Sequence, residues 1–138
     1  MTVIPTIDLV DALASEYAEK SPSEILELAL SQHGEIAISF SGAEDVVLID
    51  MASHLGQPFR VFSLDTGRLH PETYQFLETV RKHYNIDIEI CFPEAQELQD
   101  FVREKGLFSF YKDDHKECCG IRKVQPLRKK LATLDGWI

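Results

Sequence analysis

The 138-residue sequence contains no apolar run close to the roughly 20 residues that a membrane-spanning helix needs. Residues 1–20 lack the basic and then apolar order of a signal peptide, because acidic residues are spread through them. Only three cysteines are present, and this odd number argues for reduced thiols or metal binding rather than a disulfide framework. These absences indicate a cytoplasmic protein with no membrane segment.

Basic residues are also scarce, since 14 Lys and Arg stand against 23 Asp and Glu and the net charge is −9. Such a chain is a poor nucleic-acid binder, because binding to phosphates needs a basic face. The exception is the stretch 120–134, which holds five bases and no acid. It could bind a small anion, although Arg128, Lys129 and Lys130 are interpreted as a solvated helix face.

Apolar residues make up 44% of the sequence and are spaced as in one globular domain covering residues 1–138. Short apolar runs alternate with segments of helical periodicity. This order predicts an α/β fold, a parallel twisted sheet with helices on both faces. The predicted strands are residues 36–40, 59–64 and 86–91, and the predicted helices are residues 7–18, 21–33, 44–52, 71–84, 93–105 and 118–134.

A turn of small residues joins the first predicted strand to the helix that follows it. It contains Ser39, Ser41 and Gly42. Because the first N–H groups of a helix lack partners and the helix dipole is positive there, such a turn can bind an anion. Gly42 would let successive N–H groups converge on one oxygen. The GxxxxGK[ST] pattern of a Walker loop is absent, and an ordinary strand-to-helix turn is the alternative.

A second polar loop, residues 65–70, follows the second predicted strand. The carboxyl ends of parallel strands share one edge of a sheet, so both loops are expected on the rim where such sheets bind ligands. Asp65 would either hold ribose hydroxyls or shape its own loop. His70 could cap the helix that begins at Pro71 or contact a ligand, and the cap is the favoured interpretation.

Cys118 and Cys119 are adjacent, which is uncommon. A bond between them would close a strained ring, so a disulfide is not expected in a reducing cell. As thiolates beside Arg122 and Lys123 they would be good ligands for a soft metal. A zinc ion or an iron–sulfur cluster needs about four ligands, and Cys91 is interpreted as a buried residue at a strand end. The pair is therefore half of a site or no site.

Three segments, in this order and spacing, closely resemble the assimilatory adenylyl-sulfate reductases: SFSGAEDVVL, LDTGRLHPETY and KGLFSFY…KECCGIRKVQPLRKKL. That family belongs with the phosphoadenylyl-sulfate (PAPS) reductases and has an adenine nucleotide alpha hydrolase-like fold with a modified PP-loop. The resemblance covers about residues 21–137. It implies reduction of adenosine 5′-phosphosulfate (APS) to sulfite and AMP in sulfate assimilation and cysteine biosynthesis, with thioredoxin as electron donor. It also implies a cytoplasmic homo-oligomer.

The resemblance also assigns roles to residues. Cys118 and Cys119 would be ligands of a [4Fe-4S] cluster, and Lys123 would link the cluster to the substrate. Tandem cysteines mark the branch of the family that uses the substrate without a 3′-phosphate. The residues implied in substrate binding come from both loops: Ser39, Ser41, Gly42, Leu64, Asp65, Thr66, Gly67 and Arg68.

The family pattern also contains a second pair of cluster cysteines and a catalytic cysteine, and no residue here matches them. The sequence is therefore expected to be the N-terminal portion of a longer reductase, truncated at the C-terminus, that binds nucleotide but is inactive alone. The alternatives are a PAPS reductase, a non-catalytic adenine-nucleotide-binding module and an adenylyl-transfer enzyme of the pyrophosphatase type. The last would hold ATP and magnesium, and it is disfavoured because alanine and glutamate stand in the loop where those enzymes have Gly-Lys-Asp-Ser.

Overall fold

The computed structural model describes residues 6–112 and 115–138. Four parallel strands form one sheet in the order β3-β2-β1-β4. This confirms the predicted α/β class, and the first three strands lie within the ranges expected from the sequence. The strands are β1 (Ile36–Ser39), β2 (Val61–Leu64), β3 (Ile88–Cys91) and β4 (Gly136–Trp137).

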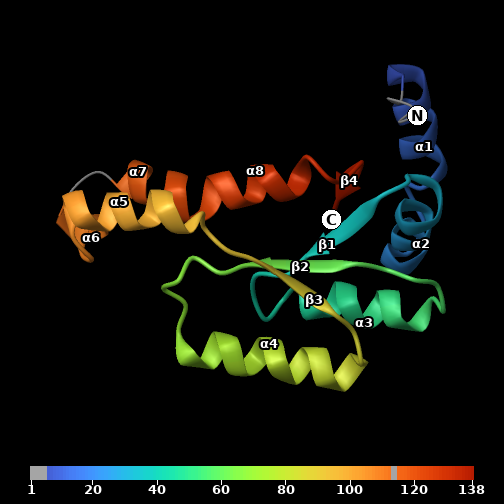
Figure 1. Ribbon diagram of the computed structural model, residues 1–138. Helices are drawn as coiled ribbons and strands as arrows, with labels where there is room; N and C mark the ends of the chain where they lie inside the picture. The colour runs from blue at the N-terminus through green and yellow to red at the C-terminus, as the bar shows by residue number, and fades with distance from the viewer. Residues whose placement is uncertain (1–5, 113–114) are drawn as a thin grey trace.

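The helices lie at the edge of the sheet and on both of its faces, as predicted. Figure 1 shows α3 and α4 below the sheet and α8 above it. The bounds are α1 (Ile7–Glu16), α2 (Pro22–Gln32), α3 (Val46–His54), α4 (Pro71–Tyr84), α5 (Ala95–Lys105), α6 (Ser109–Lys112), α7 (His115–Cys119), a π-helix η1 (Gly120–Val124) and α8 (Gln125–Leu131). The α2 helix begins with a reciprocal capping box between Ser21 and Glu24, which satisfies two otherwise unpartnered N–H groups.

The main core lies between the sheet and helices α2, α3 and α4. Ile38, Phe40 and Ile49 are fully buried there. Phe40 also packs against Phe76 of α4, with ring centroids 5.7 Å apart. Burial of such side chains is the main stabilising term for a domain of this size.

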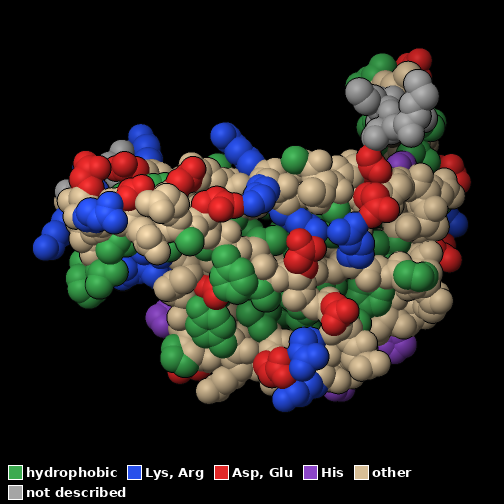
Figure 2. All heavy atoms as spheres, viewed as in Figure 1, with side chains coloured by type: hydrophobic (Ala, Val, Ile, Leu, Met, Phe, Trp, Pro, Cys, Tyr) green, Lys and Arg blue, Asp and Glu red, His purple; other side chains and the backbone are tan. Residues whose placement is uncertain are grey.

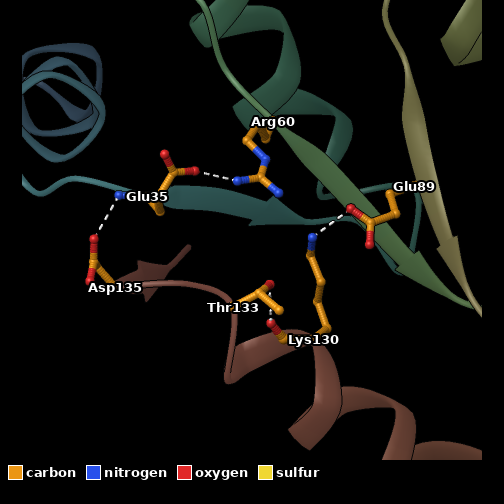
Figure 3. A network of polar contacts seen from close by, with 6 residues as sticks. All are labelled: Glu35, Arg60, Glu89, Lys130, Thr133 and Asp135. Atoms are coloured by element: carbon orange, nitrogen blue, oxygen red, sulfur yellow. Dashed lines mark hydrogen bonds and ion pairs between the residues drawn. The ribbon is translucent and has the colours of Figure 1, made fainter.

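Helix α8 covers the opposite face of the sheet, and the residue that it buries against the sheet, Lys130, is charged. Lys130 is only 5% exposed, and its ammonium lies 5.9 Å from the ring centroid of Phe62 and pairs with Glu89 of β3 (Figure 3). The interpretation of residues 128–130 as a solvated helix face is therefore wrong for Lys130. Its aliphatic stem is buried while its charge reaches a carboxylate at the edge of the sheet.

Strand β4 was not predicted, because a two-residue strand around a glycine has no apolar run. The residue before the strand holds it beside β1. The carboxylate of this residue, Asp135, accepts a hydrogen bond of 2.9 Å from the N–H of Glu35 (Figure 3). The contact is close because Gly34, at φ +74°, has no side chain, and a Cβ there would lie 2.3 Å from Asp135. The pairing continues to Ser39, whose N–H donates to the Ile138 carbonyl at 2.7 Å.

The predicted helix 118–134 is broken into α7, η1 and α8. In η1 the hydrogen bonds span five residues, and the N–H of Gln125 donates to the Gly120 carbonyl. Pro126 follows at the start of α8 and has no N–H to donate, so the change of pattern falls where a proline is tolerated. Such π segments are frequent at functional sites.

Helix α1 stands away from the rest of the molecule in Figure 1, and it buries none of its residues. Within residues 6–112 and 115–138, no helix has both the length and the apolar character needed to cross a bilayer.

Candidate functional site

The turn after β1 does hold an anion, but that anion belongs to the chain. The Asp45 carboxylate accepts hydrogen bonds from the N–H of Ser41 at 2.7 Å, from the Ser41 hydroxyl at 2.9 Å and from the N–H of Gly42 at 3.0 Å. Gly42 is not among the glycines with positive φ. The turn therefore does not use the backbone conformation for which a glycine was expected here. The converging N–H groups that the sequence predicts are present and are occupied by an internal carboxylate.

The hydrogen bonds at this turn set the charge state of Asp45. Burial by itself would raise the pKa of this carboxyl group, but the hydrogen bonds from Ser41 and Gly42 outweigh burial and hold the pKa below its ordinary value. Asp45 is therefore ionised at neutral pH. An external anion that uses the same N–H groups has to displace a carboxylate.

The loop after β2 is shaped by Asp65. This carboxylate is 7% exposed and accepts from the N–H of Gly67 at 2.7 Å and from the Tyr74 hydroxyl at 2.9 Å. Burial, followed by the Asp65 carboxylate, raises the pKa of Tyr74. Of the two interpretations of Asp65, these contacts favour the one in which it shapes its own loop. His70 occupies the N-cap position of α4, but its side chain makes no capping hydrogen bond, so the expected cap is wrong.

A pocket of about 210 Å³ opens between this loop and the cysteine segment. It brings together five of the residues that the sequence singled out. The remaining candidates (Ser39, Ser41, Gly42, Leu64, Asp65 and Gly67) do not line it. The lining residues are Thr66, Arg68, Phe110, Tyr111, Cys118, Cys119, Arg122 and Lys123.

The lining of this pocket is cationic. Arg68, Arg122 and Lys123 contribute positive charge, and no carboxylate is among the described lining residues. In a partly dry pocket, fixed cations attract an anion more strongly than they do in water. The pocket is therefore suited to a negatively charged ligand.

Arg122 is the buried cation of this group, with 7% of its surface exposed. Its Nη1 donates to the Thr66 carbonyl at 2.7 Å, and its Nε has no hydrogen-bond partner in the described part of the chain. Buried polar groups without partners are costly, so an unsatisfied donor beside a pocket marks a place for an acceptor. From the sequence, Arg122 was expected only to be a cation near the thiols.

The two adjacent cysteines are free thiols on the same pocket. Cys118 is 5% exposed and Cys119 is half-buried. Because η1 takes more residues per turn than an α-helix, the four residues from Cys119 to Lys123 make slightly less than one turn rather than slightly more. The side chains of Cys119 and Lys123 line the same pocket.

These residues fit part of a metal cluster but not all of it. The thiols and the unsatisfied donor of Arg122 suit a sulfur-rich group, yet two thiols are half of a four-cysteine ligand set. In the described residues no group of three or more His, Cys, Asp and Glu is placed to hold a metal ion. Cys91, the third cysteine, lines a different cavity beside Lys129 and Lys130, and burial raises its pKa.

Sequence reasoning gave no role to Asp45, Phe110 or Tyr111. A signal for Asp45 was present, since an acid three or four residues after Ser-Gly can reach back to the N–H groups of the turn. Phe110 and Tyr111 lie in the KGLFSFY segment that carries part of the resemblance, but their residue types alone do not separate a pocket wall from an exposed surface.

Comparisons with known proteins agree with this architecture. Residues 35–138 match the family model described as the phosphoadenosine phosphosulfate reductase domain. The chain is similar to a solved structure of the PAPS reductase of Candida auris, in a phosphate complex, with a TM-score of 0.83. The sequence identity is 22%, and the match covers 96% of this chain and 66% of the other, so it shows the shared fold. The parallel sheet with helices on both faces is consistent with the adenine nucleotide alpha hydrolase-like fold that the resemblance implied.

The curated relatives are more similar in sequence. The adenosine 5′-phosphosulfate reductase of Pseudomonas aeruginosa (strain LESB58) is 59% identical over 127 residues, which cover 91% of this chain and 48% of the relative. The 5′-adenylylsulfate reductase 1 of Arabidopsis thaliana, named as chloroplastic, is 57% identical over 133 residues, covering 96% of this chain and 29% of the relative. The chain thus spans about half the length of the bacterial relative. From the family model and these identities, the chain belongs to the phosphoadenosine phosphosulfate reductase domain family.

Proposed function

We propose that this chain is the nucleotide-binding portion of an adenylyl-sulfate reductase, which converts APS to sulfite and AMP. The observation that carries the proposal is the pocket in which three cations face two adjacent thiols. Support for the substrate class comes from relatives that are 59% and 57% identical and are named as reductases of adenylyl sulfate.

The reaction is a two-electron reduction at sulfur. The bond between sulfur and the bridging oxygen breaks, AMP leaves with that oxygen, and the sulfur leaves as sulfite. Two electrons come from a dithiol, which becomes a disulfide and releases two protons. We assign that dithiol to thioredoxin, by the resemblance. The attacking thiol of the family is not among Cys91, Cys118 and Cys119, so we expect no sulfite from this chain alone.

The cations of the pocket would act by binding and by charge. A phosphosulfate carries two negative charges, and a thiolate approaching its sulfur is repelled by them. Lys123 and Arg122 would lessen that repulsion, while Arg68 would orient the nucleotide. Cys118 and Cys119 would supply two of the four ligands of a [4Fe-4S] cluster, and the Nε–H of Arg122 would donate to that group.

Because two ligands leave half of a cluster open to solvent, the isolated chain should be colourless and free of iron. We further place the reaction in a reducing compartment such as the cytoplasm, because all three cysteines are free thiols. Iron analysis and the absorbance of the purified chain check whether it is free of iron. Stoichiometric iron with brown absorbance would contradict it, unless two chains share one cluster.

Calorimetric titration of the chain tests the nucleotide site. AMP should bind with a measurable exchange of heat, and ATP with magnesium should bind no better, because the turn lacks the lysine of a Walker loop. The opposite order would favour the pyrophosphatase-type enzyme. Stronger binding of adenosine 3′,5′-bisphosphate than of AMP would favour the PAPS reductase alternative. A second experiment joins this chain to the second half of a relative. Tight AMP binding without sulfite release from the joined protein would favour the non-catalytic module.

A further inference from the structure

Arg68 is held in place by a short aromatic segment that nothing in the proposed function uses. Its Nη1 donates to the Leu107 carbonyl, and its guanidinium carbon lies 5.6 Å from the ring centroid of Phe108 and 6.0 Å from that of Tyr111. We propose that Phe108 and Tyr111 are positioning residues, which clamp the Arg68 guanidinium at the wall of the pocket so that it meets an anionic ligand in one orientation.

The exposure of these aromatic residues supports a role other than core packing. Phe108 is 60% exposed and Tyr111 is 73% exposed, so neither ring buries much of its surface. Figure 1 places α6 at the far end of the molecule from β4, and Figure 2 shows hydrophobic side chains gathered at that end. What the two rings share is the guanidinium between them, and a cation within about 6 Å of an aromatic face is attracted to it.

The clamp is one of two arginine contacts that join the loop after β2 to the part of the chain that follows α5. Arg68 leaves the loop and donates to Leu107, next to α6. Arg122 comes from η1 and donates to the Thr66 carbonyl at 2.7 Å. Both arginines line the same pocket, and both are fixed by a backbone carbonyl. Arg122 therefore ties the loop to the segment that carries the two thiols, and Arg68 ties the same loop to the residue before the two rings.

Fixing Arg68 before a ligand arrives would raise affinity. A free arginine side chain loses rotamer entropy when it is immobilised, and a clamped arginine has already lost part of that entropy. The proposal rests on the proposed function for the identity of the ligand. The clamp itself exists without ligand, so it can be tested separately.

Nuclear magnetic resonance of the ligand-free chain tests the clamp directly. The Nε–H and Cδ–H signals of Arg68 should both be shifted upfield by the two rings. The double variant Phe108→Leu/Tyr111→Leu should lose both shifts. Tyr111→Phe should keep them, because only the ring is used, and Phe92→Leu, which alters a 63% exposed phenylalanine elsewhere, serves as the control. An unchanged Arg68 signal in a folded double variant would overturn the proposal.

Calorimetry with AMP tests the consequence for binding. The double variant should weaken AMP binding about fivefold, as expected for two exposed cation–π contacts. The same double change made on an Arg68→Ala background should cost nothing further, whereas equal losses on both backgrounds would overturn the positioning role. If the unsubstituted chain binds no AMP, the proposed function fails, and the Arg68 signals still decide whether the clamp exists.

Discussion

The Nη1 of Arg122 lies 2.7 Å from the carbonyl oxygen of Thr66, although the two residues are 56 positions apart in the sequence. This hydrogen bond joins the π-helical segment after the two cysteines to the loop at the carboxyl end of β2. It is partly buried, and Gly67 lies close to the Arg122 side chain. A Cβ on Gly67 would lie 3.3 Å from the Arg122 guanidinium, and the residue has a φ of +70°, which glycine adopts at low cost.

Replacement of Arg122 by lysine should lower stability although the charge is kept. An ammonium group cannot reproduce the planar geometry of the guanidinium, so the bond to Thr66 would be lost or lengthened. We expect the free energy of unfolding to fall by about 1–3 kcal/mol, the range for a buried hydrogen bond to a charged group. Urea denaturation measures this, with Arg128→Lys on the exposed face of α8 as the control. Equal effects of the two substitutions would show that the Thr66 contact contributes nothing.

Asp45→Asn should reduce stability in a manner that depends on pH. The folded chain holds the pKa of Asp45 below its ordinary value, so the stabilisation by its charge is fully present above the ordinary pKa, about 4. It is lost as the pH falls through the lowered pKa. The variant should therefore be less stable than the unsubstituted chain by about 1 kcal/mol at neutral pH, and the gap should narrow below about pH 4. Thermal unfolding between pH 3 and pH 7 measures this gap, and a gap that widens at low pH would contradict the assignment.

The same substitution should improve the binding of inorganic phosphate. In the unsubstituted chain the N–H groups of Ser41 and Gly42 are occupied by the Asp45 carboxylate, which also repels anions. An amide oxygen is uncharged and easier to displace. Glu44→Gln is the control, because it removes the same charge from a carboxylate that lies beside Gly42, whereas the hydrogen bonds from the turn go to Asp45. Phosphate titration should show tighter binding for Asp45→Asn than for Glu44→Gln. Equal affinities would mean that the turn does not bind anions.

The pair formed by Lys130 and Glu89 should respond unequally to removal of its two partners. Glu89→Ala would leave the ammonium of Lys130, which is 5% exposed, without its carboxylate. Lys130→Met would place an apolar chain over Phe62 and leave only the half-exposed carboxylate of Glu89 unpaired. We expect Glu89→Ala to be the more destabilising by roughly 1–3 kcal/mol, because an unpaired buried charge costs more than the pair contributes. Chemical denaturation of both variants measures the difference, and the reverse order would contradict this view of α8.

The parts of the fold that the sequence predicted are those with a local signal. Ile36, Ile38 and Phe40 form an apolar run, and Ser21 with Glu24 forms a recognisable cap, so the strand β1 and the start of α2 could be placed. Strand β4 could not, because Gly136 and Trp137 become a strand only through pairing with β1, more than 90 positions earlier.

The candidate site also has a part made of residues close together in sequence and a part made of distant residues. Cys118, Cys119 and Lys123 are neighbours in sequence and line one pocket, so residues close together in the chain make up this part of the site. The burial of Lys130 depends on Glu89, and the position of Arg68 depends on Leu107 and the rings after it. Such contacts between distant residues cannot be predicted from residue type, because the sequence does not distinguish a buried lysine from an exposed one.

A chimera tests whether this chain carries the nucleotide-binding half of an adenylyl-sulfate reductase. The chain would replace the matching 127 residues of the Pseudomonas aeruginosa reductase, with which it is 59% identical, and sulfite release from APS would be measured with reduced thioredoxin. We expect sulfite release that falls strongly with Lys123→Ala, which alters the pocket, while the melting temperature is nearly unchanged. Lys129→Ala, which removes an exposed lysine paired with Glu94, should do little to either. A folded chimera that releases no sulfite, or equal losses from the two lysine substitutions, would contradict the account.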